Sequence, residues 1–541
     1  MFKKKQLSLI LGIFICFTSL QLSAQSDYSN YSKLSQRLKN LQSSNSPVCK
    51  LEALTKTVGG HTIWSLTLSK GDAKNKPAIA IVSGVDGKHI LGPEMAVSIA
   101  ENIVKNHADI LKTTTFYIFP NMSPNATENY FSSLKHYENG NARKTDDDRD
   151  GTTNEDPFED LNKDGVITLM RIEDATGNYI KLEEDNRIVV PADKNKGQLG
   201  KYKVVSEGID NDKDGKFNED GKGGIQFNKN FSFNYPYFKA GAGEHAVSEK
   251  ENRALLDFLY QQWNIFAIIT LGPENNLSKP LKYNAGGARK RVVTSILKND
   301  ASLNKFLSGK YNKITKTKGA PAANGKGGSF SEWSYFHFGK LALSTPGWWA
   351  PKFKGDSLVK AKKNKYANFL QWADKEGIEN AFVPWTEVNH PDFPNQKVEI
   401  GGISPYIMYN PPFKMVDDIS KKHTDFIVEL TKIQPNVVLE NIKTESVDNG
   451  FTRVTVDIHN KGLLPTHTEM GKRSRWLRKI KVAISLNKNQ EIISGRKITL
   501  INSIDGDSSV KMTWLIKGKG SVSLEAGTSH TGIDKATIQL K

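Results

Sequence analysis

Apolar residues follow one another almost without interruption in four short stretches of the first 350 residues: 76–84 (after its first two residues), 114–119, 266–271 and 341–344. A strand covered on both faces has this pattern, because neither face meets water. Between the stretches, apolar residues recur at helical spacing in 93–106, 248–263 and 356–375. Strands that alternate with helices predict an α/β fold with a largely parallel or mixed sheet.

The pattern changes near Gln434. From there to Lys541, apolar and polar residues alternate in short segments separated by Gly, Asn and Asp turns: 453–459, 479–486, 493–500, 510–516, 521–526 and 536–540. Many short strands at regular spacing predict a β-sandwich, which we place at 436–541. Because Pro435 interrupts the chain, we place the boundary at 431–436, after an α/β domain at 25–432.

The first 24 residues have the features of a signal peptide. Three lysines precede an apolar run at 7–20, and Ser23-Ala24 supplies small residues for cleavage. The run is too short for a comfortable membrane span, so we predict export to a periplasm or the medium without stable membrane insertion. The mature chain would keep Cys49 as its single cysteine, which excludes an internal disulfide.

Composition adds little to this picture. A hydrophobic content of 38% and a charged content of 25% describe an ordinary globular protein. The formal net charge is +17, but Lys is spread along the chain and no nucleic-acid motif accompanies it. We therefore predict a basic solvated surface and no nucleic-acid partner. Attraction to acidic polymers or anionic cell surfaces is the alternative.

Three stretches between 145 and 221 repeat one acidic spacing followed by glycine. Their oxygen-bearing residues are Asp146, Asp148 and Asp150; Asp160, Asn162 and Asp164; and Asp210, Asp212 and Asp214. Alternate oxygens before a glycine form the front half of a calcium loop. The place of the bidentate glutamate is taken by Pro157, Arg171 and Gly221, so these are not EF-hands. Calcium-stabilised loops of another geometry and plain solvated acidic turns both stay open.

Several segments, in their order along the chain, resemble the zinc carboxypeptidase family, in particular exported bacterial members with Asp-rich inserts. Among them are IVSGVDGKHILGPEMA, EGIDNDKDGKFNEDGKGGIQFNKNF, FAIITLGPENN and GGSFSEWSYFHFGKLALSTPGWW. The resemblance covers about residues 75–412. It implies a mixed sheet flanked by helices and a zinc ion held by three protein ligands. It also implies that the C-terminal module is a β-sandwich of the kind appended to these enzymes.

The resemblance places the metal ligands at positions where this chain differs. The family's first motif, H-x-x-E, falls on Asp86 and His89, so both donors are changed. The third ligand falls on Gly272, which has no side-chain donor. Asp and His can each bind zinc, but their reach differs, so a swapped pair would move the metal. The three positions are therefore degenerate zinc positions.

The catalytic and substrate positions implied by the resemblance also differ. The catalytic glutamate falls on Thr345 or Pro346, and neither is a base near neutral pH. The Asn-Arg substrate motif becomes Asn228-Lys229, which keeps the charge but loses the bidentate fork. Arg143 lies where the family often has a substrate-facing arginine.

Two functions of different classes follow. The first is a non-catalytic protein that binds a peptide C-terminus or another carboxylate through the three substrate positions. The second is an active metallocarboxypeptidase or amidase with a rearranged zinc site. A structural calcium-loaded module is a third option. We interpret Glu274 as a solvent-facing loop acid; the alternative is that, directly after Gly272-Pro273, it reaches a cleft. His245, His337 and His390 are spare candidate donors for a rearranged site, although a single histidine of this kind is more often structural.

Overall fold

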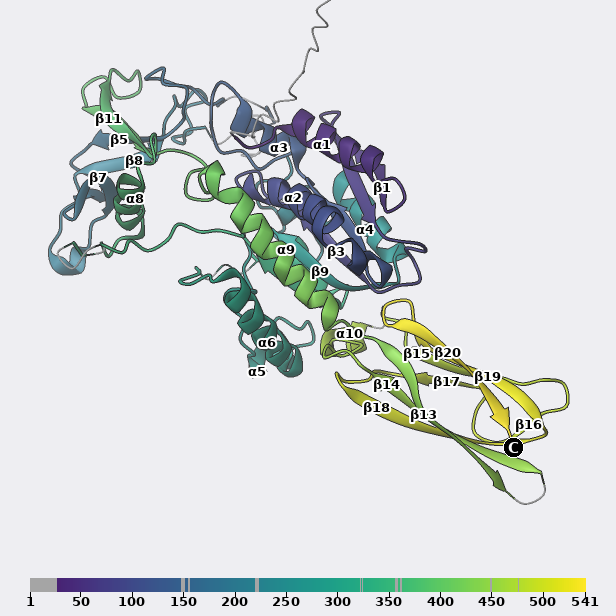
Figure 1. Cartoon of the computed structure of the whole chain (residues 1–541). Coiled ribbons are helices and arrows are strands. Elements are labelled where there is room, and N and C mark those ends of the chain that lie inside the picture. Colours follow the sequence, from purple (N-terminus) through teal and green to yellow (C-terminus); the bar gives the residue numbers. More distant parts are fainter. Residues whose placement is uncertain are drawn as a thin grey trace, which may run out of the picture.

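The structure is a computed structural model of the whole chain (Figure 1). It describes residues 27–541 except 147–150, 154–155, 219–222, 322, 324, 356–358, 361, 448–449 and 475. The predicted signal peptide therefore lies outside the described residues, as do Asp148 and Asp150 of the first Asp-rich stretch. Within the described ranges, we find no helix with the length and apolar character needed to cross a membrane.

A six-stranded mixed sheet lies at the centre, in the order β1-β2-β4-β3-β9-β10. Its strands are β1 (Cys49–Lys56), β2 (Thr62–Leu68), β3 (Ala78–Ser83), β4 (Thr115–Phe119), β9 (Ile265–Leu271) and β10 (Leu341–Thr345). The four strands predicted from apolar runs are β3, β4, β9 and β10. The pairs β4–β3, β3–β9 and β9–β10 are all parallel. β1 and β2 pair antiparallel and extend the sheet through β4. The α/β fold with a mixed sheet is confirmed.

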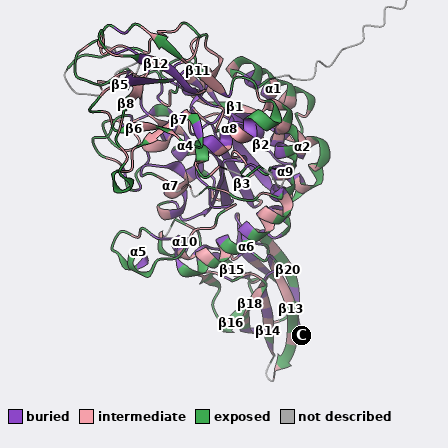
Figure 2. Ribbon diagram, turned by 90° about the vertical axis from the view of Figure 1, so that its left-hand side faces the viewer, coloured by how far each residue is buried: buried purple, intermediate pink, exposed green. Residues whose placement is uncertain are grey.

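Helices cover both faces of this sheet because its strands are apolar on both faces. In β3, Ile79 and Ile81 enter one core, while Ala80 and Val82 enter the other. The first core receives α1 (Tyr31–Ser44), α2 (Leu91–Asn106), α6 (Lys298–Thr315) and α9 (Val416–Lys432). The second receives α4 (Lys250–Gln261) and α7 (Phe330–Phe336). Figure 2 shows the buried strands enclosed between these layers.

A second six-stranded sheet, not predicted from the sequence, forms a separate lobe. Its order is β11-β12-β5-β8-β6-β7, from β5 (Leu169–Glu173), β6 (Tyr179–Leu182), β7 (Asp185–Pro191), β8 (Tyr202–Ser206), β11 (Phe382–Val388) and β12 (Val398–Ile403). The helix predicted at 356–375 is α8 (Lys365–Glu376), which packs near β7. Shorter helices are α3 (Pro124–Glu128), α5 (Ala285–Arg289) and α10 (Glu469–Ser474).

The C-terminal part consists of two four-stranded sheets that share one apolar core. The first has the order β13-β14-β18-β16 and the second β17-β15-β19-β20. Their strands are β13 (Val437–Val447), β14 (Phe451–Asn460), β15 (Ile480–Ser485), β16 (Glu491–Ser494), β17 (Ile498–Ile501), β18 (Ser508–Lys517), β19 (Gly520–Thr528) and β20 (Gly532–Leu540). These sheets lie at the opposite end of the molecule from the second lobe (Figure 1).

One strand prediction in this part is wrong. Residues 493–500 form two strands, because Gly495 adopts a φ of 103° that ends the extended run. β16 pairs with β18 in one sheet, and β17 pairs with β15 in the other. α9 ends at Lys432 and β13 begins at Val437, while independent folding of the two parts stays a prediction.

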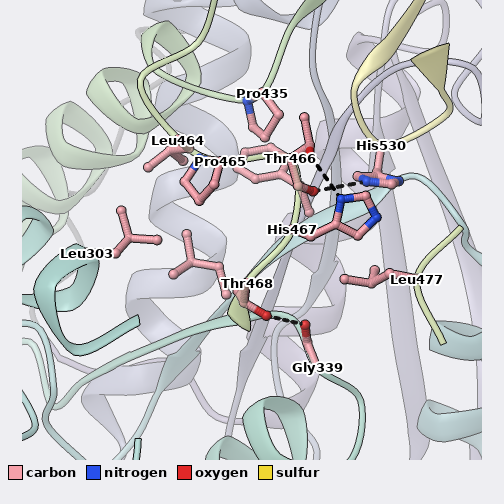
Figure 3. A pocket seen from close by; sticks show the side chains of 12 residues that line it. Leu303, Gly339, Pro435, Leu464, Pro465, Thr466, His467, Thr468, Leu477 and His530 are labelled. Carbon is pink, nitrogen blue, oxygen red and sulfur yellow. Dashed lines mark hydrogen bonds between the residues drawn. The ribbon is translucent and has the colours of Figure 1, made fainter. Parts of the chain in front are cut away.

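The two parts meet in a contact that contains buried basic groups. Asp300 accepts hydrogen bonds from the Glu469 and Met470 amides at 2.7 and 3.0 Å. Beside this contact is a small cavity of about 20 Å³, lined in part by His467 and His530 (Figure 3). The two imidazoles meet edge to face with centroids 5.0 Å apart.

Each histidine ring is hydrogen-bonded through both nitrogens. Nε2 of His467 donates to the Arg478 carbonyl, and Nε2 of His530 donates to the Thr466 carbonyl. Lys340 is also buried nearby and donates to the Ile265 carbonyl at 2.7 Å. Within the described ranges, none of these three basic groups forms an ion pair.

Candidate functional site

The predicted metal and catalytic positions lie at one edge of the central sheet. Asp86 and His89 follow β3, Gly272 follows β9, and Thr345 ends β10. Because these strands are parallel, their carboxyl ends share one edge, where open α/β sheets bind ligands. The Gly272 amide donates to the Thr345 carbonyl at 3.1 Å, and His89 Nε2 donates to the Pro346 carbonyl at 2.8 Å. The structure therefore brings these positions together.

The space for a third metal ligand is filled by a neighbouring side chain. A Cβ atom at Gly272 would lie 2.4 Å from Cγ2 of Val85, closer than real Cβ atoms approach. Val85 is 2% exposed and belongs to the apolar core on one face of β3. A histidine at position 272 would therefore have to displace Val85, and glycine itself offers no donor.

The two remaining donors have different surroundings. His89 is 4% exposed, and burial lowers its pKa, which keeps the imidazole neutral. Because its Nε2 carries the proton donated to Pro346, the lone pair is on Nδ1, which is buried without a partner. Asp86 is partly exposed, and its Oδ1 accepts the Lys88 amide at 2.9 Å.

These residues do not fit a zinc site with three protein ligands. Such a site needs three donors around one point at about 2.0–2.3 Å from the ion. Across the residues that the structure describes, one group of three His, Cys, Asp or Glu donors gathers within 4.8 Å, and it lies elsewhere: Asp210, Asp212 and Asp214. Asp86 and His89 therefore have no third donor of these types at that spacing.

The predicted position of the catalytic base holds no carboxylate. Thr345 is fully buried, and its hydroxyl lies 2.8 Å from the Tyr311 hydroxyl of α6. The same hydroxyl accepts the Gly347 amide at 3.0 Å. Thr345 therefore makes structural hydrogen bonds to α6 and to the following turn, and Pro346 has no titratable group.

Glu274 is buried, so its interpretation as a solvent-facing acid is wrong. It is 6% exposed, and its Oε1 accepts Nδ2 of Asn228 at 2.7 Å. Oε2 is buried without a partner. Burial, and then repulsion by Asp86 and Glu332, raises the pKa of Glu274 to about 7. Asn228 also accepts the Phe330 amide, so its side-chain amide is engaged within the protein.

Arg143 lines a large cavity, and Lys229 contacts Ala240, a residue of its wall. Lys229 Nζ donates to the Ala240 carbonyl at 3.1 Å, and Arg143 Nε donates to Glu249 at 3.3 Å. The cavity of about 540 Å³ is lined by Arg143, Lys144, Thr145, Asp146, Ile225, Tyr237, Phe238, Lys239, Ala240, Gly241, Gly243, Glu244, Ser248 and Glu249. Its volume lies in the range of small-molecule sites.

The Arg143 guanidinium is held by a buried, well-supported carboxylate. Glu249 is 1% exposed. Its oxygens also accept Nδ2 of Asn141 at 2.6 Å and the Ser248 hydroxyl at 2.9 Å. Neither Nη group of Arg143 makes a hydrogen bond to a residue that the structure describes. A guanidinium fixed at one edge can use the other edge to bind a carboxylate in two parallel hydrogen bonds.

The family model described as "Zinc carboxypeptidase" matches residues 34–345 of this chain, more than half of its 541 residues. The chain belongs to the zinc carboxypeptidase family. A second model, a domain of unknown function (DUF8731), matches residues 436–539. Comparison with curated proteins gives no match.

Solved carboxypeptidase structures resemble the chain at low identity. Carboxypeptidase A from Helicoverpa armigera is 13% identical, with 65% of this chain and 71% of that chain covered and a TM-score of 0.38. Thrombin activatable fibrinolysis inhibitor is 10% identical, with 75% and 74% covered and a TM-score of 0.42. Metallo-carboxypeptidase from Burkholderia cenocepacia is 11% identical, with 58% of each chain covered and a TM-score of 0.30. These values are too low to bear on function.

Each of the three Asp-rich stretches contains the same internal hydrogen bond. The amide of the glycine donates to the aspartate five residues earlier, at 3.0, 2.7 and 3.1 Å in the pairs Gly151–Asp146, Gly165–Asp160 and Gly215–Asp210. The glycines have φ values of 103°, 82° and 86°, which only glycine adopts readily. The repeated spacing therefore gives the same hydrogen bond from glycine to aspartate in each stretch.

Buried carboxylates already hold the second and third of these stretches in place. Asp156 is fully buried and accepts the amides of Asn211 and Asn218. Glu207 is also fully buried and accepts the amides of Leu161 and Thr168. The second and third stretches are thus held by buried carboxylates, so their geometry alone does not require an ion.

The three spare histidines are apart from the zinc positions. His245 is exposed. His337 is hydrogen-bonded to the Ser232 hydroxyl at 2.8 Å. His390 is buried and donates to the Gly208 carbonyl at 2.8 Å. Within the described ranges, none of them joins Asp86 or His89 in a group of three close donors.

The sequence interpretation did not include Val85, Tyr237 or Phe238. Nothing in the sequence pointed to Val85, because its contact with Gly272 depends on the pairing of β3 with β9. The two aromatic residues lie in the run Tyr235–Phe238, YPYF. Aromatic residues clustered in a loop could have indicated a binding surface.

Proposed function

We propose that this protein is an exported, non-catalytic member of the zinc carboxypeptidase family that binds a carboxylate-bearing ligand. One observation carries the non-catalytic part: Val85 fills the space that a third zinc ligand at position 272 would need. A zinc-bound water and a general base are the two catalytic devices of such a site, and general-base assistance alone contributes roughly 10²–10⁴-fold. Position 272 has no metal donor, and positions 345 and 346 have no carboxylate.

The binding part is supported by Arg143 at the wall of the 540 Å³ cavity. Glu249 orients the guanidinium, so little conformational freedom is lost when a carboxylate binds. Asn228 supports the proposal less, because Glu274 already accepts its amide hydrogen bond. Lys229 borders the cavity through the Ala240 carbonyl and contributes positive charge.

The rival function is a metallocarboxypeptidase or amidase with a rearranged zinc site. It is favoured by two buried atoms that lack hydrogen-bond partners, Nδ1 of His89 and Oε2 of Glu274. Such atoms are costly unless something binds them. A metal could bind them only after a shift that brings them toward a third donor.

Replacing Arg143 tests the binding function. We expect Arg143→Lys to weaken binding of N-acetylglycine by about tenfold, because a charge-assisted hydrogen bond contributes about 1.5–3 kcal/mol. Lys keeps a cation beside Glu249, so the fold is retained. The control Arg253→Lys changes an exposed arginine of α4 that pairs with Asp257. Isothermal titration should show no binding of N-acetylglycinamide. Equal affinity of the Arg143→Lys variant and the unmodified protein for N-acetylglycine would contradict the proposal.

We also propose that the Asp-rich turns bind calcium. Asp210, Asp212 and Asp214 support this most, because one oxygen of each lies within 4.8 Å of the others. Binding to the folded state at a hundredfold excess over Kd adds about 2.7 kcal/mol, so a chelator should lower the melting temperature by several degrees. In the variant Asp210→Asn, Asp212→Asn, the chelator should lower the melting temperature by less than in the unmodified protein. Identical melting curves of the unmodified protein with and without chelator would refute calcium binding.

A further inference from the structure

One segment holds most of the net positive charge, although Lys occurs along the whole sequence. Residues 275–331 contain twelve Lys and Arg residues and one acid, so they carry +11 of the chain's formal +17. The acid, Asp300, is 5% exposed and accepts hydrogen bonds from the Glu469 and Met470 amides. The charge that this segment presents to solvent is therefore positive.

Helix α6 presents lysines on the face that points away from the core. Its buried residues are Asp300, Asn304, Leu307, Ser308, Tyr311 and Thr315. Lys298, Lys305 and Lys313 are exposed. They lie seven and eight residues apart, close to two helical turns each, so they project from the opposite face. The helical rise separates them by about 10 and 12 Å along the axis. α6 thus carries a row of three widely spaced cations.

Two neighbouring segments extend this row. Residues 279–291, which contain α5, and helix α10 pack against the start of α6. Ala288 of α5, Leu297 before α6 and Met470 of α10 share one small apolar core. Figures 1 and 2 both show the three helices beside one another. Together these segments expose nine basic side chains, which we call the basic surface: Lys279, Lys282, Arg289, Lys290, Arg291, Lys298, Lys305, Lys313 and Arg473.

The basic surface has no counter-charge within the protein. Among the described residues, none of its nine side chains forms an ion pair. At its border, Lys310 pairs with Glu429 and Lys472 with Asp505. The acid of α10, Glu469, accepts the Asn299 amide at 3.0 Å. Since like charges repel, a cluster of this kind costs free energy in the free protein, and a bound polyanion offsets that cost.

We propose that the basic surface binds an acidic polysaccharide. The cations of α6 recur at about 10–12 Å, which suits a polymer whose carboxylates are carried on separate sugar units. Phosphates of one DNA strand are much closer together, at about 3.4 Å. A helix that binds a membrane inserts its apolar face, whereas Leu307 and Tyr311 of α6 are fully buried in the protein core. The inference is independent of the proposed function, because none of the nine residues lines the Arg143 cavity.

Binding of polygalacturonate at low salt tests this proposal. We expect the unmodified protein to bind polygalacturonate but not the neutral polymer dextran, with an affinity that falls steeply as salt rises, because counterions are released. In the variant Lys298→Gln, Lys305→Gln, Lys313→Gln, binding should be about tenfold weaker or more, and less dependent on salt. Gln has nearly the helix propensity of Lys, so α6 is retained. Interferometry on immobilised polymer measures these affinities.

The control Lys488→Gln, Lys497→Gln, Lys519→Gln removes as many exposed lysines from the C-terminal sheets. It should bind polygalacturonate as the unmodified protein does. The α6 variant should keep its affinity for N-acetylglycine, and Arg143→Lys should keep the affinity for polygalacturonate, which separates this surface from the cavity.

Three results would show that the proposal is wrong, and none of them bears against the proposed function. The unmodified protein does not bind polygalacturonate, the two triple variants bind it equally, or Arg143→Lys loses it. Binding of phosphatidylglycerol vesicles or duplex DNA without binding of polygalacturonate would assign the basic surface to a membrane or a nucleic acid instead.

Discussion

Changing Asp86 to His, His89 to Glu and Gly272 to His in one chain should not create a tight zinc site. These changes restore the family's ligand types at the positions that the sequence alignment assigns. However, the new Cβ at position 272 would lie 2.4 Å from Cγ2 of Val85. Overpacking of this kind costs about 1–3 kcal/mol. The triple variant should therefore melt at a lower temperature and bind zinc poorly.

Adding Val85→Ala should change this result. Alanine removes the Cγ atoms that occupy the ligand's space, so the quadruple variant should bind one zinc ion per chain, measured by mass spectrometry of the native protein. Its peptidase activity should stay low, because Thr345 and Pro346 still supply no base. Val85→Ala alone is the control and should bind no zinc. Tight zinc binding by the triple variant would show that Gly272 is not the third ligand position.

Acidification from pH 7 to pH 4 should lower the free energy of unfolding through His467 and His530. Burial, the main cause, lowers the pKa of His467 to about 4 and holds the pKa of His530 well below its usual value. In the unfolded chain both titrate near pH 6.5. Below that pH the unfolded state binds more protons than the folded state, so stability falls as the pH falls toward 4. For His467, whose pKa is about 4 in the folded chain and near 6.5 in the unfolded chain, the cost at pH 4 is about 3 kcal/mol.

Lys340 also makes the free energy of unfolding fall as the pH falls, but at higher pH. Burial lowers its pKa to about 7, so its contribution is lost between pH 10.5 and pH 7. The charges of Lys340 and Lys472 act on His467, and those of His467 and Lys340 act on His530. Among the described residues, no carboxylate offsets the protonation of the two histidines. Urea unfolding of His467→Gln, His530→Gln should show a flatter pH dependence below pH 7. His245→Gln, at an exposed position, is the control. An unchanged slope in the double variant would contradict this assignment.

The central sheet could be predicted because its strands are buried on both faces. In β3 and β9 almost every side chain is apolar, and this pattern has few alternatives. β5 and β6 could not be predicted in the same way. They are only five and four residues long, and they carry Arg171 and Lys181 among their apolar residues. β5 also pairs with β12, which lies more than 220 residues later in the chain, so this part of the sheet depends on contacts between distant segments.

The location of the candidate site could be predicted from the sequence, but the contacts of its residues could not. Asp86, His89 and Gly272 each follow a predicted parallel strand, so their meeting at one edge follows from topology. The burial of Glu274 did not follow, because its partner Asn228 is 46 residues away in the sequence. The different partners of Arg143 and Asn228, which are Glu249 and Glu274, did not follow either, since a motif alone assigned both residues to one substrate site.

Zinc content of the unmodified mature protein tests the central claim most directly. The protein should be purified without immobilised metal, incubated with equimolar zinc and analysed by mass spectrometry under native conditions. We expect much less than one zinc ion per chain and no carboxypeptidase activity on peptides with varied C-terminal residues, because the two donors Asp86 and His89 lack a third. One zinc ion per chain together with peptide trimming, both lost in His89→Ala, would contradict the account and establish a working variant of the family's zinc site.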